Sequence, residues 1–282
     1  MSVRMILAAA LLAANLAVSA CATAQPSEAN AAPTLAALQG DYFELRSAIL
    51  GRSLHIHVNL PENYARESRG YPTVYLTDGD SLFPLLAPTH LFLSYDEPVP
   101  PAVLVGIAYG AFDPNAGNLR HIDFIAPAPD APGGGAAAFQ RMLAEELIPE
   151  IERRYRANPA RRILVGQSRG AGFVVYSALT QPDLFWGRIA SNPAFRGRRE
   201  TFFEPAASGA PSGSALFVAS GARDRADIRA EALRWFEHWN AQTARPWTLR
   251  TVTIENGTHA ASIGEVYRQG MLWLFRDEPP AT

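Results

Sequence analysis

The side chains of this sequence that could carry out covalent chemistry begin with Ser168. It stands in Gly166-Gln167-Ser168-Arg169-Gly170, directly after an apolar run that predicts a strand and directly before a pattern that predicts a helix. A Gly-x-Ser-x-Gly turn between a strand and a helix projects the serine hydroxyl above the edge of a sheet. Glycines are needed on both sides because a side chain there would collide with the turn or the neighbouring strand. We therefore predict that Ser168 is a nucleophile.

The base that would activate this serine is a histidine, because the sequence contains no lysine. Schiff-base chemistry and a Ser–Lys pair are thereby excluded. His259 follows the predicted strand 247–254, whereas His238 lies inside a predicted helix. We therefore predict that His259 is the base.

The acid that would orient this histidine is Asp224, which comes just after the predicted strand 215–220. In a sheet of the hydrolase type, the nucleophile, the acid and the base follow in that order along the chain, each in a loop at the carboxyl end of a strand. Asp227 is the alternative acid, although it could equally be the N-cap of the helix that follows. We favour Asp224.

These loops require a parallel sheet, and the rest of the chain has the pattern of one. Apolar segments typical of strands alternate with amphipathic segments typical of helices. Strands are predicted at 42–48, 52–60, 71–77, 102–108, from 162 to the turn before Ser168, and at 187–191, 215–220 and 247–254; helices are predicted at 136–155, from the turn to about 179, and at 227–242 and 264–275. The sequence thus predicts an α/β fold: a mostly parallel sheet with an antiparallel amino-terminal edge and helices on both faces.

The amino terminus has the pattern of a secretory leader. Residues 1–24 hold one early charge and then an apolar run too short for a membrane span, which predicts a signal peptide. Val18-Ser19-Ala20-Cys21 resembles a lipobox that would place a lipid on Cys21, whereas Ala22-Thr23-Ala24 fits an ordinary cleavage site that would remove this cysteine. We expect a bacterial protein that is exported, either soluble in the periplasm or anchored to a membrane. A flexible tether is predicted at 25–40 and a single domain at 41–278.

Charge and histidine spacing exclude other classes of partner. The formal net charge of −2 argues against nucleic acid as a ligand. His55 and His57 share one face of a predicted strand, but no third ligand follows at a suitable spacing, so we predict no metal site. No organic cofactor is expected, and the sequence makes no prediction of the oligomeric state.

Several segments of the chain match one known family. They are Tyr75-Leu76-Thr77-Asp78-Gly79-Asp80, Arg120-His121-Ile122-Asp123-Phe124, Glu145-Glu146-Leu147-Ile148-Pro149, Arg153-Arg154-Tyr155-Arg156, the turn around Ser168, and Gly257-Thr258-His259. On these segments the chain, from about Ser47 to its carboxyl terminus, resembles the putative-esterase family of α/β-hydrolases, which includes esterase D and the enterochelin esterases. It is most similar to the exported branch that resembles ferric-siderophore hydrolases. The resemblance implies the α/β-hydrolase fold.

A serine nucleophile also needs donors for the oxyanion that forms in its reaction. The backbone N–H of Arg169, which follows the nucleophile directly, is one expected donor. The second should come from the loop after the strand 71–77, which places Gly79 or Asp80 there. Glycine at this position would let the backbone approach the substrate closely.

The substrate pocket is predicted from fewer signals. Trp186 and Phe195 could form an aromatic wall for a catecholate or aryl group, the alternative being that both are core residues. We also assign Arg120, in the long predicted loop 110–135, to substrate binding. Arg169 and Arg223 flank the catalytic loops and could attract an anionic substrate, although exposed arginines paired with water are the alternative.

The sequence therefore predicts a serine carboxylic-ester hydrolase that forms an acyl-enzyme. Small-molecule esters of the siderophore or aryl type are the substrates that the resemblance implies. A membrane-tethered, non-catalytic domain with a hydrolase-like fold is the alternative from another class of function. A serine peptidase would need the same three side chains, but the sequence has no propeller or large cap domain that would favour peptides.

Overall fold

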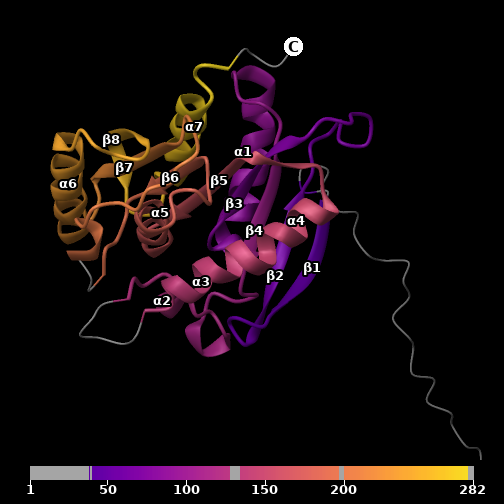
Figure 1. Ribbon diagram of the computed structural model, residues 1–282, viewed down its shortest axis with the longest axis horizontal. Helices are drawn as coiled ribbons and strands as arrows, with labels where there is room; N and C mark the ends of the chain where they lie inside the picture. Colours follow the sequence, from indigo (N-terminus) through magenta and orange to yellow (C-terminus); the bar gives the residue numbers. More distant parts are fainter. Residues whose placement is uncertain (1–37, 39, 128–133, 197–199, 279–282) are drawn as a thin grey trace, which may run out of the picture. The chain divides into compact units, whose positions relative to one another are not determined.

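The computed structural model of this chain describes Leu38 and residues 40–127, 134–196 and 200–278 (Figure 1). The predicted signal peptide, including Cys21, and nearly all of the predicted tether lie outside these residues. Among the residues that are described, no helix is both long and apolar enough to cross a membrane.

The sheet contains eight strands in the order β1-β2-β4-β3-β5-β6-β7-β8. Their bounds are β1 (Gly40–Ser47), β2 (Arg52–Asn59), β3 (Tyr71–Leu76), β4 (Val103–Ala108), β5 (Ala157–Gln167), β6 (Gly187–Ser191), β7 (Ala215–Arg223) and β8 (Thr248–Thr258). β1 and β2 form an antiparallel hairpin, and β2 also runs antiparallel to β4. All strands from β3 to β8 are parallel to their neighbours in that part of the sheet. The predicted mixed sheet with an antiparallel amino-terminal edge is confirmed.

Helices cover both faces of this sheet (Figure 1). They are α1 (Gly79–Asp96), α2 (Arg120–Asp123), α3 (Ala136–Met142), α4 (Ile148–Arg154), α5 (Arg169–Thr180), α6 (Ala226–Ala241) and α7 (Ile263–Leu274), with a π-helical turn at Leu143–Leu147 and 3-10 turns at Pro114–Ala116 and Glu200–Phe202. Side chains of α3, α4, α5 and α6 share one apolar layer, and side chains of α1 and α7 share the other.

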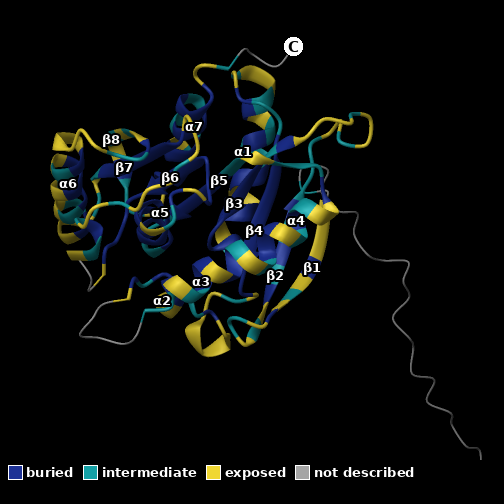
Figure 2. Cartoon of the chain, viewed as in Figure 1, coloured by how far each residue is buried: buried dark blue, intermediate teal, exposed yellow. Residues whose placement is uncertain are grey.

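The two layers arise from the alternation of side chains along each strand. On β5, Leu164 packs in the layer of α3 to α6, while Ile163 and Val165 pack in the layer of α1 and α7. Successive side chains of a strand point to opposite faces, so a central strand with apolar residues in a row supplies both layers. Figure 2 accordingly shows the central strands as buried and the outer faces of the helices as exposed.

Helix α1 is the element that the sequence pattern did not predict. Pro84 and Pro88 lie inside it, and proline in a helix interior removes a backbone donor and normally ends the helix. Burial of Leu82, Phe83 and Leu86 against the sheet stabilises the helix in spite of them.

Several predicted elements also differ in length from the observed ones. The predicted helix 136–155 is interrupted by the π-helical turn, and α2 lies within the predicted loop 110–135. β7 and β8 run three and four residues beyond their predicted ends, to Arg223 and Thr258. Each of these two strands therefore ends on the residue directly before a predicted catalytic side chain.

A buried histidine on α1 predicts how the fold responds to acid. His90 Nδ1 lies 2.8 Å from the Tyr267 hydroxyl of α7, and Nε2 lies 3.1 Å from the Pro100 carbonyl oxygen. Burial lowers the pKa of His90 to about 4, against an ordinary value near 6.5. As the pH falls from about 6.5 to about 4, the unfolded chain binds a proton at this position that the folded chain does not, so stability is lost in this window, by about 3 kcal/mol.

The test is urea denaturation of wild type and His90→Gln at pH 7 and pH 4.5. We expect the variant to be about 1–2 kcal/mol less stable at pH 7, because it loses part of two buried hydrogen bonds. It should also lose less stability than wild type on acidification. An equal loss in the two proteins would show that His90 is not the acid-sensitive group.

Candidate active site

Ser168 lies in a sharp turn between β5 and α5. Its φ of 58° is in the left-handed region that residues with a side chain rarely adopt. A Cβ atom on Gly166 would lie 2.4 Å from the carbonyl carbon of Gly170, and one on Gly170 would lie 2.4 Å from Thr77 Oγ1. Because both positions exclude a side chain, the turn has the geometry that the Gly-x-Ser-x-Gly sequence predicts.

Ser168, His259 and Asp224 are joined by two hydrogen bonds. Ser168 Oγ lies 2.9 Å from His259 Nε2, and His259 Nδ1 lies 2.8 Å from Asp224 Oδ1. A carboxylate only accepts, so Nδ1 donates and Nε2 is left to accept the serine proton. The Asp224 side chain is 0% exposed and the His259 side chain is 26% exposed. A buried carboxylate thus faces an imidazole that remains accessible.

The pairing of β7 with β8 brings the acid and the histidine together. Arg223 and Thr258 are opposite each other in the register of these two strands. Asp224 and His259 follow these residues directly, so both side chains leave the sheet at the same place. β5 ends at the same carboxyl edge because it is parallel to β7 and β8.

The alternative acid does not reach the histidine. Asp227 lies in the first turn of α6 with its side chain 62% exposed, and its Oδ2 is 3.1 Å from Arg225 Nη2. The geometry therefore favours Asp224 over Asp227.

The predicted oxyanion donors lie at the amino ends of two helices. Arg169 opens α5, and Gly79 and Asp80 open α1. Backbone N–H groups in the first turn of a helix have no partner within the helix, and the helix dipole adds positive potential there. A Cβ atom on Gly79 would lie 2.6 Å from the Ile107 nitrogen, so the close approach of α1 to β4 requires glycine.

Carboxylates after β3 tie this end of α1 to the neighbouring loops. Asp80 accepts the backbone N–H groups of Tyr109 and Gly110, at 2.8 and 2.9 Å. Asp78, which has a φ of 53°, accepts both Nε and Nη2 of Arg120, at 2.6 and 2.9 Å. These bonds fix the loop that would supply the second oxyanion donor.

Arg120 forms an ion pair with Asp78 and also lines a hollow beside the candidate site. Burial raises the pKa of Asp78, and the hydrogen bonds and charge of Arg120 oppose this rise. Removing the guanidinium would leave a buried carboxylate unpaired, which is strongly unfavourable. A hollow of about 300 Å³ opens beside this ion pair, and its lining residues are Asp78, Asp80, Ser81, Leu82, Phe112, Asn118, Arg120 and Gln167.

Two other arginines lie near enough to Arg169, the residue after Ser168, to act on its charge. Burial, together with the charges of Arg120 and Arg196, lowers the pKa of the Arg169 guanidinium, while Asp78 acts in the opposite direction. An anionic group bound among these three arginines would reduce their mutual repulsion. Arg223, at the end of β7, is exposed.

The predicted aromatic wall is wrong, because both of its members are core residues. Trp186 precedes β6 and therefore lies at the opposite edge of the sheet from Ser168, where its ring packs on Phe275 at 5.4 Å. Phe195 is 1% exposed and packs on Phe202, with 4.4 Å between the ring centroids. The sequence could not distinguish these positions, because the direction of β6 decides which of its flanking residues reach the site.

His55 and His57 of β2, the pair considered above as metal ligands, contact aromatic side chains. Tyr42 Oη lies 2.7 Å from His55 Nδ1, and the His57 ring stacks at a tilt on Phe83. Among the described residues, no group of three or more His, Cys, Asp or Glu side chains could hold a metal ion.

Two side chains that the sequence pattern did not single out hold the histidine loop. The amide nitrogens of Gln167 and Asn192 both donate to the backbone oxygen of His259, the latter at 2.9 Å. Asn192 adopts a φ of 48°. The available signal was an asparagine directly after a predicted strand, since asparagine tolerates the left-handed region better than most residues.

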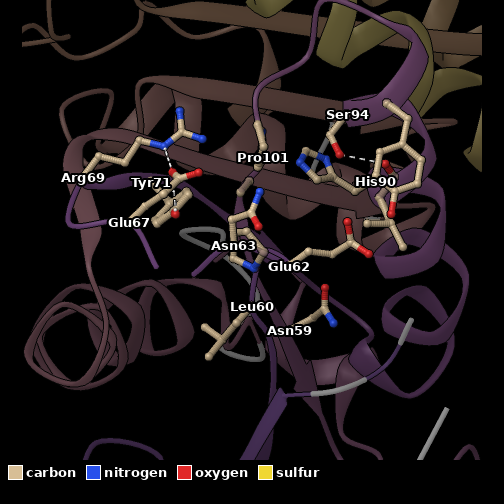
Figure 3. Close-up of a pocket in the computed structure, with 14 residues that line it drawn as sticks. Asn59, Leu60, Glu62, Asn63, Glu67, Arg69, Tyr71, His90, Ser94 and Pro101 are labelled. Carbon is tan, nitrogen blue, oxygen red and sulfur yellow. Dashed lines mark hydrogen bonds and ion pairs between the residues drawn. The ribbon is translucent and has the colours of Figure 1, made fainter. Parts of the chain in front are cut away.

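A separate hollow of about 230 Å³ lies at the other end of the sheet, between the end of β2 and the start of β3 (Figure 3). Several of its polar groups have partners within the protein. Glu67 accepts from the Tyr71 hydroxyl at 2.9 Å, both ring nitrogens of His90 are bonded, and Ser94 Oγ donates to the Leu91 carbonyl at 2.7 Å. The candidate catalytic side chains are at the opposite edge.

Comparison with known proteins gives a family for this chain. The family model described as "Putative esterase" matches residues 47–266. Ferri-bacillibactin esterase BesA of Bacillus subtilis (strain 168) is 35% identical over 159 residues, which cover 51% of this chain and 54% of that protein. The chain spans about half the length of the curated relatives it matches.

Solved structures resemble the fold over a larger share of the chain. Siderophore hydrolase EstB from Aspergillus nidulans has a TM-score of 0.71 at 19% identity, covering 89% of this chain and 99% of its own. An IroE-like serine hydrolase from Shewanella oneidensis also has a TM-score of 0.71, at 22% identity, covering 85% of this chain and 81% of its own. At such identities the likeness concerns the fold alone.

Proposed function

The chain belongs to the putative esterase family and has the α/β-hydrolase fold, and from this premise we propose that it is a serine carboxylic-ester hydrolase. Ser168 is the proposed nucleophile, His259 the base and Asp224 the acid. The observation that carries the proposal is the unbroken pair of hydrogen bonds from Ser168 Oγ through the imidazole to Asp224. These three groups suffice for acyl transfer without a metal ion or an organic cofactor.

The proposed reaction begins with attack of Ser168 Oγ on the ester carbonyl. His259 Nε2 takes the hydroxyl proton as the bond from Oγ to the carbonyl carbon forms, and Asp224 stabilises the resulting imidazolium. The tetrahedral intermediate then expels the alcohol, which receives the proton from Nε2. Water repeats the sequence on the acyl-enzyme, with His259 again as the base, and releases the acid and free Ser168.

The negative charge of the intermediate needs donors that are in place before the reaction. We assign the backbone N–H of Arg169 and that of Gly79 or Asp80 to this role. Their places in the first turns of α5 and α1 support the assignment, because these N–H groups have no partner within their helices.

Siderophore-type or aryl esters are the proposed substrates. The relatives that carry this proposal are named for ferri-bacillibactin, siderophore and enterobactin hydrolysis. The charges of Arg169, which follows Ser168, and of Arg196 near it suit an anionic ester, and the hollow beside the Arg120–Asp78 pair can take part of a substrate. The proposed site of action is outside the cytoplasm, since residues 1–24 have the pattern of a signal peptide, with a lipobox-like stretch at Cys21 and an ordinary cleavage site at Ala22-Thr23-Ala24 as the two alternatives.

A non-catalytic domain is the weaker account of these features. Such a domain would have no need of a strained serine whose hydroxyl meets a histidine and a buried carboxylate in order. A peptidase would use the same groups, but no observation on the described residues favours a peptide over an ester.

The test of the proposed function is hydrolysis of nitrophenyl esters by the purified protein, followed by ferric complexes of catecholate triesters. We expect turnover of short-chain and aryl nitrophenyl esters, and cleavage of the siderophore esters seen as released monomers by chromatography. A protein that hydrolyses none of these esters and does not react with a fluorophosphonate would contradict the proposal.

A further inference from the structure

We propose that Asn192 is a positioning residue for this reaction, whose side-chain amide fixes the histidine loop against the strand ends that carry the nucleophile and the acid. The inference rests on the proposed function and adds to it a residue outside the three catalytic groups. Asn192 directly follows β6, the strand between β5 and β7 in the sheet. It is fully buried.

The side chain of Asn192 bonds two different segments, a strand through its acceptor and the histidine loop through its donors. Oδ1 accepts the backbone N–H of Gly221 on β7 at 2.7 Å. Nδ2 lies 2.9 Å from the carbonyl oxygen of His259 and 2.7 Å from Ser262 Oγ. One planar amide thus joins the strand that leads to Asp224 with the backbone of the catalytic histidine.

The backbone around Asn192 is bonded to the nucleophile. Ser191 accepts the N–H of Ser168 through its carbonyl oxygen at 3.0 Å, and Ala194 donates its own N–H to the Ser168 carbonyl at 3.0 Å. Asn192 stands between these two residues. It therefore connects the positions of all three catalytic groups without touching a reacting atom.

Backbone strain points to the same residue. Among the described residues, the non-glycine positions with positive φ are Asp78, Ser168 and Asn192. They follow β3, β5 and β6, which are neighbours in the sheet, so all three lie at the edge where the candidate site is built. Such conformations persist where the surrounding bonds impose them, and they concentrate at functional sites.

Asparagine is the residue type that these contacts require. The position needs an acceptor for Gly221 and donors for His259 and Ser262 in one short, planar side chain that tolerates the left-handed region. Aspartate would keep the shape and the acceptor, but it would turn an oxygen towards the carbonyl of His259. Glycine would keep the backbone conformation and lose every side-chain bond.

The experiment compares wild type with Asn192→Asp and Asn192→Gly, using a nitrophenyl ester. Rates are normalised to the fraction of Ser168 that a fluorophosphonate labels to completion, so that unfolded protein does not count. We expect kcat per labelled site to fall about a hundredfold in both variants, with KM within about twofold of wild type, because misplacement of a catalytic group by about 1 Å has this effect. Hydrogen exchange of residues 256–263 should be faster in both.

The matched control is Gln140→Ala, which removes another buried amide, whose Nε2 donates to Thr180 Oγ1 at 3.1 Å and bonds no other group among the described residues. It should lower the melting temperature and leave kcat per labelled site within about twofold of wild type. If the Asn192 variants contain less protein that the fluorophosphonate can label, but kcat per labelled site equals that of wild type, then Asn192 contributes to folding alone and the positioning role is overturned. Failure of the proposed function is distinct from this result, since it would appear as absence of hydrolysis and labelling in wild type itself.

Discussion

Ser168→Ala is expected to lower kcat for nitrophenyl esters by about 10³- to 10⁶-fold. The Ser168 hydroxyl is the proposed nucleophile, since its oxygen lies 2.9 Å from His259 Nε2, the atom that would take its proton. Serine nucleophiles removed in this way leave only the catalysis that comes from binding and from the oxyanion donors. The measurement is the steady-state rate with purified wild type and variant at equal concentration.

The structure of the variant should be unchanged, because alanine removes one oxygen from a partly exposed position. Equal melting temperatures, and loss of fluorophosphonate labelling in the variant alone, are the controls for this result. A variant that keeps more than about a tenth of the activity would mean that another residue, or a contaminating enzyme, performs the hydrolysis.

The turn that carries Ser168 could be predicted from sequence because it is encoded locally, and the position of His259 could be predicted from its place after a later strand. The glycines of the Ser168 turn are required by contacts within a few residues and with one neighbouring strand: a Cβ atom on Gly166, for example, would lie 2.4 Å from the carbonyl carbon of Gly170. His259 was placed by chain order, since each catalytic loop of such a sheet follows a strand. The mixed sheet followed from the alternation of strand and helix patterns in the same way.

What escaped prediction depends on contacts between distant segments. Helix α1 contains two prolines that argue against a helix, and only its burial on the sheet stabilises it. Trp186 and Phe195 are aromatic residues on either side of β6, and the sequence does not show which of them reaches the site. Trp186 precedes β6 and lies at the edge of the sheet opposite Ser168, whereas Phe195 follows β6 but packs in the core. The role inferred for Asn192 arises from bonds to β7 and to the histidine loop, neither of which is near it in sequence.

The second large effect is expected from substitution of the acid. The structure offers a matched comparison between Asp224, which bonds His259, and Asp227, which does not. Asp224→Asn is expected to lower kcat by about 10⁴-fold with little change in KM, whereas Asp227→Asn should stay within about twofold of wild type. The Asp227 side chain is exposed and paired with Arg225, so removing its charge leaves the site as it was. Steady-state kinetics of both variants on one nitrophenyl ester is the measurement.

The size of the Asp224 effect follows from the two ways in which an asparagine could sit there. With its amide nitrogen facing His259, Nδ1 would have to accept, so Nε2 would carry the proton and could not take one from Ser168. With its oxygen facing His259, the amide nitrogen would take the place of Asp224 Oδ2, which is buried and has no hydrogen-bond partner among the described residues. A buried donor without a partner is unfavourable, and the imidazolium would still lose its counter-charge. Both arrangements remove the stabilisation of the transition state, so a small effect at Asp224, or a large one at Asp227, would assign the acid to a different residue.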